Sequence, residues 1–255
     1  MQQPEYVNVG GTFIALRRMA GSEPGLVWLG GFRSDMKGTK AEALAQWAAG
    51  HGRAFLRFDY SGHGESGGRF VDGTISKWLA ESLAVFGQFT TGRQVLVASS
   101  MGAWIALRMV EELHEQDEGG RVAGLILLAP APDFTSELVE PALTRAARWA
   151  LDKNGFFEER SAYSTEPDIY TKALIEDGRE NRVLAGPIDT RCPVHVIQGL
   201  ADPDVPHSHA LRLVSLLPAD DVTLSLVPDG DHRLSRPQDI AMIIGGVEEM
   251  LSRIG

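Results

Sequence analysis

The sequence contains few features of a secreted, membrane-spanning or nucleic-acid-binding protein. It holds one cysteine, Cys192, so no disulfide can form within the chain, and a disulfide-stabilised secreted fold is not expected. Its 24 basic residues are outnumbered by 34 acidic ones, which gives a net charge of -10. This charge argues against a general nucleic-acid or anionic-membrane role, because both depend on basic surface.

The sequence also lacks long apolar runs. No window approaches the roughly 18 apolar residues that span a bilayer, so we expect no membrane span. The N-terminal residues 1–5 contain no basic segment that leads into an apolar one, as a signal peptide would. We therefore expect a cytoplasmic location.

Short apolar runs alternate with longer stretches of helical periodicity along most of the 255 residues. Continuous apolar runs are typical of strands that are covered on both faces of a parallel sheet. Gly10-Gly11 also predicts a turn within an N-terminal hairpin. The alternation predicts an α/β protein with a doubly wound, mostly parallel sheet. The expected strands lie at 26–29, 54–58, 95–97, 125–128, 194–197 and 222–227, and the clearest helices at 41–49, 75–89, 104–113, 210–217 and 240–251.

One interval, residues 133–189, interrupts this alternation. It contains no convincing strand, and residues 138–151 and 169–184 show a helical pattern. It is too long for a simple connection. We predict a helical lid, inserted between the core segments 1–132 and 190–255, at the strand edge where ligands bind in such folds. An additional surface helix pair without a role in binding is the alternative.

Ser100 lies where an apolar strand runs directly into an apolar helix. The residues two before and two after it, Ala98 and Gly102, are small, as the tight turn of a nucleophile elbow requires. Such a turn directs the N-terminus of the next helix toward a developing oxyanion, and the N–H of Met101 would be one donor. Ser99 is less suitable, because larger residues would then occupy the small positions.

The loop Gly30-Gly31-Phe32 follows the strand at 26–29 and is expected to supply the second oxyanion donor, the N–H of Phe32. Glycines let the backbone approach a substrate closely, so Gly31 is a candidate for substrate binding. Arg33 is another candidate and would contact an acidic substrate. The alternatives are an ordinary glycine turn and a solvated surface arginine.

The catalytic acid and base are expected after two further strands. Asp202 lies in the loop after 194–197 and would orient the imidazole, and His232 follows 222–227 and would accept the Ser100 proton. Asp204 is a rival acid, while Asp229 and Asp231 adjoin the histidine too closely. The remaining histidines considered are expected to be structural or exposed: His51, His63, His195, His207 and His209.

No group of His, Cys and Asp residues has metal-ligand spacing, so we expect no metal. Gly62-x-Gly64 lacks the third glycine of a dinucleotide loop and is interpreted as a structural turn. We therefore expect no cofactor.

Taken together, these motifs resemble the α/β-hydrolase superfamily over essentially the whole chain. They occur in family order: Asp59-x-x-Gly62-x-Gly64-x-Ser66, the elbow at Ser100, Gly199-x-x-Asp202-x-x-Val205-Pro206 and Gly230-Asp231-His232. Within the superfamily, the chain resembles the mitochondrial hydrolases described as palmitoyl-protein thioesterases and acyl-glucuronide esterases. That closer resemblance rests on Gly38-Thr39-Lys40, residues 57–62, Cys192-Pro193 and Asp231-His232-Arg233.

The resemblance implies a triad of Ser100, Asp202 and His232 and cleavage of thioesters or activated acyl esters. We expect a serine hydrolase, a carboxylesterase or acyl-thioesterase, that acts through an acyl-enzyme on a small-molecule ester or thioester. Two alternatives remain open, a non-catalytic receptor on the same fold and a carbon-carbon-bond hydrolase or perhydrolase with the same triad. Apolar residues of the expected lid suggest an apolar acyl group: Leu138, Leu143, Trp149, Phe156 and Phe157.

Overall fold

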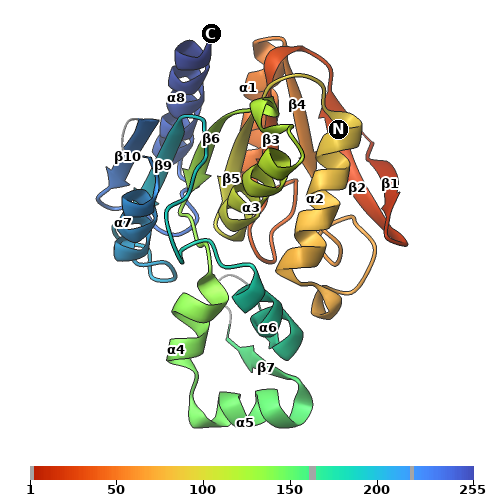
Figure 1. The fold of residues 1–255 in the computed structure, drawn as a ribbon, viewed down its shortest axis with the longest axis vertical. Coiled ribbons are helices and arrows are strands. Elements are labelled where there is room, and N and C mark those ends of the chain that lie inside the picture. The colour runs from red at the N-terminus through yellow and green to blue at the C-terminus, as the bar shows by residue number, and fades with distance from the viewer. Residues whose placement is uncertain (1–2, 161–164, 219–220) are drawn as a thin grey trace.

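The computed structural model, which describes residues 3–160, 165–218 and 221–255, is built around an eight-stranded sheet of order β1-β2-β4-β3-β5-β6-β9-β10 (Figure 1). The first two strands form the expected hairpin, and β2 pairs antiparallel with β4. All later neighbours pair in parallel. The strands are β1 (Glu5–Val9), β2 (Thr12–Met19), β3 (Ser22–Leu29), β4 (Arg53–Phe58), β5 (Gln94–Ser99), β6 (Val122–Leu128), β9 (Val194–Gly199) and β10 (Val222–Val227).

Helices cover both faces of the sheet. Alternate residues of β5 show why both faces are apolar, since Leu96 packs into one core cluster and Val95 and Val97 into the other. The first cluster includes side chains of α2 (Ile75–Phe89), α3 (Met101–Glu115) and α7 (His207–Leu216). The second includes side chains of α1 (Thr39–Gly50) and α8 (Pro237–Ile254). The doubly wound α/β fold is therefore confirmed.

The segment between β6 and β9 adds no strand to the main sheet and projects from its lower end (Figure 1). The prediction that it lacks strands is wrong, because β7 (Phe156–Glu159) and β8 (Asp168–Thr171) form an antiparallel pair. Each has four residues, too few for a clear alternation of apolar and polar side chains. The lid role of this segment, and the division of the chain into core and lid, stay predictions.

The helices of this segment are also shorter than expected. The predicted helix at 138–151 is divided into a π-helical turn η3 (Thr135–Val139), α4 (Glu140–Ala142) and α5 (Arg145–Asn154). The side chain of Thr144 accepts a hydrogen bond from the N–H of Ala147 and begins α5 as a new helix. The predicted helix at 169–184 is α6 (Lys172–Glu180), because its first residues belong to β8.

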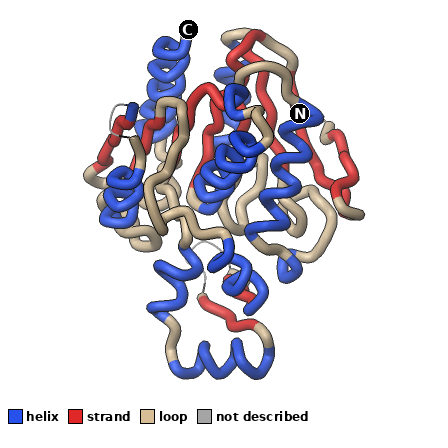
Figure 2. The backbone as a smooth tube through the Cα atoms, in the orientation of Figure 1, coloured by secondary structure: helices blue, strands red, loops and turns tan. Residues whose placement is uncertain are grey.

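The remaining short elements are the 3₁₀ turns η1 (Phe70–Asp72) and η2 (Gly119–Arg121). Loops leaving the carboxyl ends of the central strands gather at the edge of the sheet that faces the inserted segment (Figure 2). Within the described part of the chain, no helix is both long and apolar enough to cross a membrane.

Candidate active site

Ser100 occupies a strained turn between β5 and α3. Its backbone has φ 54° and ψ -118°, a region that residues other than glycine adopt rarely and at a cost of about 1–3 kcal/mol. The turn requires a glycine at position 102, since an added Cβ there would lie 2.3 Å from the carbonyl oxygen of Leu29. The methyl group of Ala98 is fully buried, so the sheet accommodates it in place of the commoner glycine.

The structure brings Ser100, His232 and Asp202 into one chain of hydrogen bonds. The Ser100 Oγ lies 3.0 Å from His232 Nε2, and His232 Nδ1 lies 2.9 Å from Asp202 Oδ2. Because the carboxylate can only accept, Nδ1 carries the proton and Nε2 is left to accept from the serine hydroxyl. Three loops that are distant in sequence thus meet at one edge of the sheet.

Asp202 is held by its own loop. Its Oδ1 accepts the N–H groups of Asp204 and Val205, each at 2.9 Å, and its Oδ2 also accepts from Gln198 Nε2 at 3.1 Å. Burial raises the pKa of Asp202, but the hydrogen bond and charge interaction with His232 and the two backbone N–H groups outweigh it, so the net pKa is lowered. The carboxylate is therefore stabilised in its ionised form beside the imidazole.

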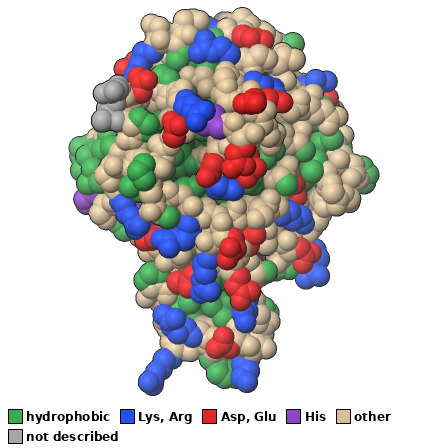
Figure 3. Space-filling view, in the orientation of Figure 1, with side chains coloured by type: hydrophobic (Ala, Val, Ile, Leu, Met, Phe, Trp, Pro, Cys, Tyr) green, Lys and Arg blue, Asp and Glu red, His purple; other side chains and the backbone are tan. Residues whose placement is uncertain are grey.

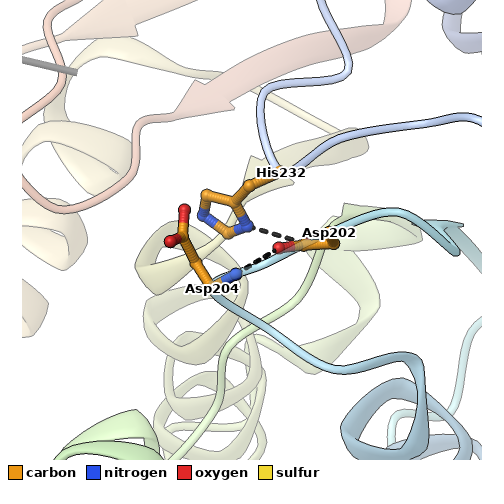
Figure 4. Close-up of side chains that lie close together, drawn as sticks. All are labelled: Asp202, Asp204 and His232. Carbon is orange, nitrogen blue, oxygen red and sulfur yellow. Dashed lines mark hydrogen bonds and ion pairs between the residues drawn. The ribbon is translucent and has the colours of Figure 1, made fainter. Parts of the chain in front are cut away.

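The rival acid Asp204 also lies beside the imidazole (Figure 4). The polar atoms of Asp202, Asp204 and His232 lie within 4.8 Å of one another, a spacing that could hold a metal ion. Both nitrogens of His232 are already in hydrogen bonds, to Asp202 and to Ser100, so neither is available as a ligand in this arrangement. The carboxylate that accepts the hydrogen bond from His232 Nδ1 is that of Asp202, whose side chain is fully buried, whereas Asp204 is exposed.

The candidate oxyanion donors lie on either side of Ser100. An added Cβ on Gly31 would lie 3.2 Å from the Cβ of Ser100, so the loop of Phe32 passes directly against the serine. Within the described part of the chain, the N–H groups of Phe32 and Met101 donate to no other protein group. Both donors are therefore open to a ligand, and their role in an oxyanion hole stays a prediction.

His63 holds the loop of Phe32 in place, a role that the sequence did not indicate. The N–H of Arg33 donates to His63 Nε2 at 3.1 Å, and Nδ1 of the same ring lies 3.1 Å from the carbonyl oxygen of Ser61. Burial lowers the pKa of His63 to about 4, so the ring is neutral near pH 7 and its Nε2 can accept. The contact joins residues thirty positions apart, which sequence periodicity cannot reveal.

The other histidines considered above contact groups other than the Ser100 hydroxyl. His209 is buried against the carbonyl oxygen of Pro132, and His195 contacts the hydroxyl of Ser225. His51 stacks on Trp47, and His207 is exposed at the start of α7.

A cavity of about 820 Å³ opens beside Ser100 and His232, under the inserted segment. Its size falls within the usual range for small-molecule sites, about 300–1,000 Å³. Arg33, Asp168 and Asp204 are among its polar lining residues. Its apolar lining comes from the Phe32 loop, the end of β6, the inserted segment and the Asp202 loop: Phe32, Phe134, Leu138, Val139, Leu143, Ala147, Phe157, Tyr170 and Val205.

Two expectations about this cavity need correction. Trp149 and Phe156 do not line it, and their side chains are 61% and 39% exposed. Phe156 precedes Phe157 on β7, and neighbouring residues of a strand point to opposite faces, so only Phe157 turns inward. Leu138 and Leu143 line the cavity as expected.

Arg33 lies in the cavity wall, but its charge is balanced there. Its guanidinium forms ion pairs with Asp168 at 3.4 Å and Glu166 at 3.5 Å and donates a hydrogen bond to the carbonyl oxygen of Pro167. It therefore ties the Phe32 loop to the segment around β8. This arrangement gives Arg33 less capacity to attract an acidic substrate than a free cation would have.

This fold and site define an α/β hydrolase. Residues 24–243 match the model of the Alpha/beta hydrolase family, and the chain belongs to that family. The predicted resemblance is therefore confirmed, and hydrolase activity is the activity that the family membership supports.

Relatives of this chain carry hydrolase names. The mitochondrial palmitoyl-protein thioesterase of Mus musculus is 31% identical over 252 residues, covering 94% of this chain and 80% of that protein. The crystal structure of a putative hydrolase from Agrobacterium vitis is 56% identical, with a TM-score of 0.93 and 97% of each chain covered. The alpha/beta hydrolase domain-containing protein 10 from mouse is 28% identical, with a TM-score of 0.90 and 100% of each chain covered.

Proposed function

We propose that this hydrolase cleaves carboxylic esters or thioesters through an acyl-enzyme on Ser100, with His232 as base and Asp202 as the orienting acid. The observation that carries the proposal is the hydrogen-bond chain from Ser100 Oγ to His232 at 3.0 Å and on to Asp202 at 2.9 Å. This is the arrangement that activates a serine hydroxyl as a nucleophile in hydrolases of unrelated folds.

In the first half of the proposed reaction, His232 Nε2 takes the proton of Ser100 as Oγ attacks the acyl carbon. The negative charge that forms on the acyl oxygen is stabilised by the N–H groups of Phe32 and Met101. Asp202 stabilises the imidazolium. The tetrahedral intermediate then collapses, the bond to the leaving oxygen or sulfur breaks, and His232 returns the proton to the leaving group.

In the second half, a water molecule attacks the acyl-enzyme. His232 takes one proton from the water, and the same two N–H groups stabilise the second tetrahedral intermediate. Collapse releases the carboxylic acid and returns the proton to Ser100. Each step uses groups of this chain, the substrate and water, so the proposal includes no cofactor.

The proposed acyl group is apolar. The cavity wall next to Ser100 includes the side chains of Phe134, Leu138, Leu143 and Phe157, which can hold an aliphatic chain away from water. Relatives named palmitoyl-protein thioesterases support a long acyl chain on sulfur as one substrate. We therefore include thioesters with long acyl chains within the proposed range.

Labelling by a fluorophosphonate probe, combined with turnover of p-nitrophenyl acetate and butyrate, tests the nucleophile. We expect the wild-type protein to be labelled and active and Ser100→Ala to lose both properties. Ser99→Ala is the matched control, because it removes the neighbouring hydroxyl and should keep both. Labelling that persists in Ser100→Ala would overturn the proposal.

A panel of esters, thioesters and diketones of matched acyl length tests the reaction class. We expect turnover of esters and thioesters that depends on Ser100. Turnover of the diketones alone would favour carbon-carbon-bond cleavage. Binding without turnover of any member would favour a receptor.

A further inference from the structure

Helix α5 presents a stripe of two cations and one large aromatic side chain to solvent. Arg145, Trp149 and Lys153 are spaced by four residues, so they lie on the same face of the helix. Trp149 is 61% exposed, the largest exposed fraction of the large hydrophobic side chains in the described part of the chain. An indole so far out of the core contributes little to folding, and between Arg145 and Lys153 it is available to a partner outside the chain.

The opposite face of α5 packs against the rest of the inserted segment. Leu151 is buried in a small cluster with Phe157 and Ile175, and Ala147 and Ala150 pack against it. This packing holds α5 against the rest of the inserted segment. The outer face of the helix makes no part of that cluster.

The cations of this face have no acidic partner in the described part of the chain. Arg145, Arg148 and Lys153 form no ion pair there, and Arg148 donates only to the carbonyl oxygen of Glu140, at 3.1 Å. Asp152 is the single acidic residue of α5, so the helix carries three basic residues against one acidic residue. Elsewhere on the inserted segment, by contrast, Arg179 pairs with Glu140.

We propose that this outer face of α5 docks on the surface of an anionic lipid bilayer. Indole rings favour the boundary between the headgroups and the acyl chains, and flanking Arg and Lys side chains can reach lipid phosphates. The net charge of -10 argues against attraction of the whole molecule. However, charges are screened beyond about 8 Å at physiological salt, so the local charge of the docking face decides the attraction.

The shape of the molecule supports a flat partner. Helix α5 lies at the extreme lower end of the molecule, away from the sheet (Figure 1), and that end carries several basic side chains with acidic ones among them (Figure 3). This end of the molecule can approach a bilayer while the acidic surface of the α/β core stays away from the bilayer. The acidic residues Glu158 and Glu159 of β7 are exposed on the same segment and border the cavity.

Docking by this face would also orient the cavity. Leu143, Thr144 and Ala147 line the cavity and belong to the start of α5 or to the turn before it. A docked α5 would therefore hold one wall of the cavity next to the acyl chains of the bilayer. The docking itself does not require a reactive Ser100 and goes beyond the proposed function.

Vesicle sedimentation tests the proposal, with vesicles of phosphatidylcholine alone or mixed with phosphatidylglycerol. We expect the full chain to bind the mixed vesicles at low salt, to be released at high salt and to bind phosphatidylcholine weakly. The triple variant Arg145→Glu, Arg148→Glu and Lys153→Glu should bind at least about tenfold more weakly, since each basic residue near such a surface contributes about fivefold. Trp149→Ala should also weaken binding.

Matched variants separate this face from the rest of the surface. Arg191→Glu changes an arginine whose side chain is 65% exposed before β9, and Phe13→Ala removes an aromatic that is 60% exposed on β2. Both should bind vesicles like the wild type. The α5 variants, Arg191→Glu and Phe13→Ala should keep their turnover of soluble p-nitrophenyl acetate, which shows that they are folded.

Three results would overturn the proposal: no binding of the wild type to the mixed vesicles, equal loss in Arg191→Glu, or binding to soluble polyglutamate but not to vesicles. The last result would indicate an acidic protein partner. Ser100→Ala should bind vesicles like the wild type, so a failure of the proposed chemistry can be distinguished from a failure of docking.

Discussion

The rings of Phe32 and Tyr170 lie almost parallel, with their centroids 5.4 Å apart and an angle of 11° between their planes. Tyr170 in turn stacks on Phe157, at 5.1 Å. The residue after Phe32, Arg33, forms an ion pair with Asp168 of the same strand, β8. The hairpin of β7 and β8 therefore contacts the loop that carries one proposed oxyanion donor.

This contact predicts that Tyr170 positions the Phe32 N–H. Tyr170→Ala should lower kcat for p-nitrophenyl acetate about tenfold, because an aromatic pair contributes about 0.5–1.5 kcal/mol. KM should change little, since acetate is too small to need the apolar wall. Tyr170→Phe keeps the stacked ring and should retain the wild-type kcat. A change in KM alone would contradict a positioning role.

Burial of His63 predicts a pH-dependent stability. The unfolded chain protonates this residue near pH 6.5, but burial lowers its pKa to about 4 in the folded protein. The unfolded state therefore binds more protons between these values, and the free energy of unfolding falls as the pH falls through this window. At pH 5 the loss relative to pH 8 should be about 2 kcal/mol from this residue.

Urea unfolding of the wild type and of His63→Gln at the two pH values measures this effect. The glutamine can still accept the Arg33 N–H but does not titrate. His195 and His209 also have lowered pKa values from burial and remain in both proteins, so the difference between the proteins isolates His63. Equal pH dependence in both would contradict the prediction.

Gly102 and Gly87 both lie in helices but should respond oppositely to alanine. A Cβ at Gly102 would lie 2.3 Å and 2.6 Å from the carbonyl oxygens of Leu29 and Gly30, which are backbone atoms that cannot swing aside. We expect Gly102→Ala to lower the free energy of unfolding by about 2 kcal/mol or more and to displace the Phe32 loop. Gly87, on α2, has no atom within 4 Å of such a Cβ. Gly87→Ala should stabilise by about 0.5–1 kcal/mol in the same urea assay.

The choice between Asp202 and Asp204 as the acid is testable by single amide substitutions. Asp202→Asn should lower kcat about 10³–10⁴-fold, because an amide in that position favours the wrong imidazole tautomer. Asp204→Asn, which changes the exposed neighbour, should lower kcat by less than about fivefold under the same conditions. A larger loss in Asp204→Asn would reverse the assignment.

Much of the fold follows from local sequence patterns. The strands around Val97 and Ile126 are continuous apolar runs because both faces of the sheet are covered, and this pattern is visible without a structure. The small residues around Ser100 likewise predict the turn, because its tightness is a local requirement. The positions of Asp202 and His232 directly after strands predict that their loops lie at the same edge of the sheet as Ser100.

Contacts made between distant segments could not be predicted in this way. The hydrogen bond from Arg33 to His63 and the stacking of Phe32 on Tyr170 depend on how loops pack in three dimensions. The strands β7 and β8 pair only with each other in the described part of the chain, and each has four residues. Four residues are too few for a detectable alternation of apolar and polar side chains. The outward position of Trp149 depends on which face of α5 the cluster around Leu151 covers.

The backbone of Ser100 has a consequence for the evolution and engineering of this chain. A glycine adopts φ 54° at little cost, whereas alanine and serine are strained there. Ser100→Gly and Ser100→Ala both remove the hydroxyl, so their difference in unfolding free energy, about 1 kcal/mol in favour of glycine, would isolate this strain. Position 100 is thus a site where thermal robustness and reactivity oppose each other, and selection for stability alone would replace the serine.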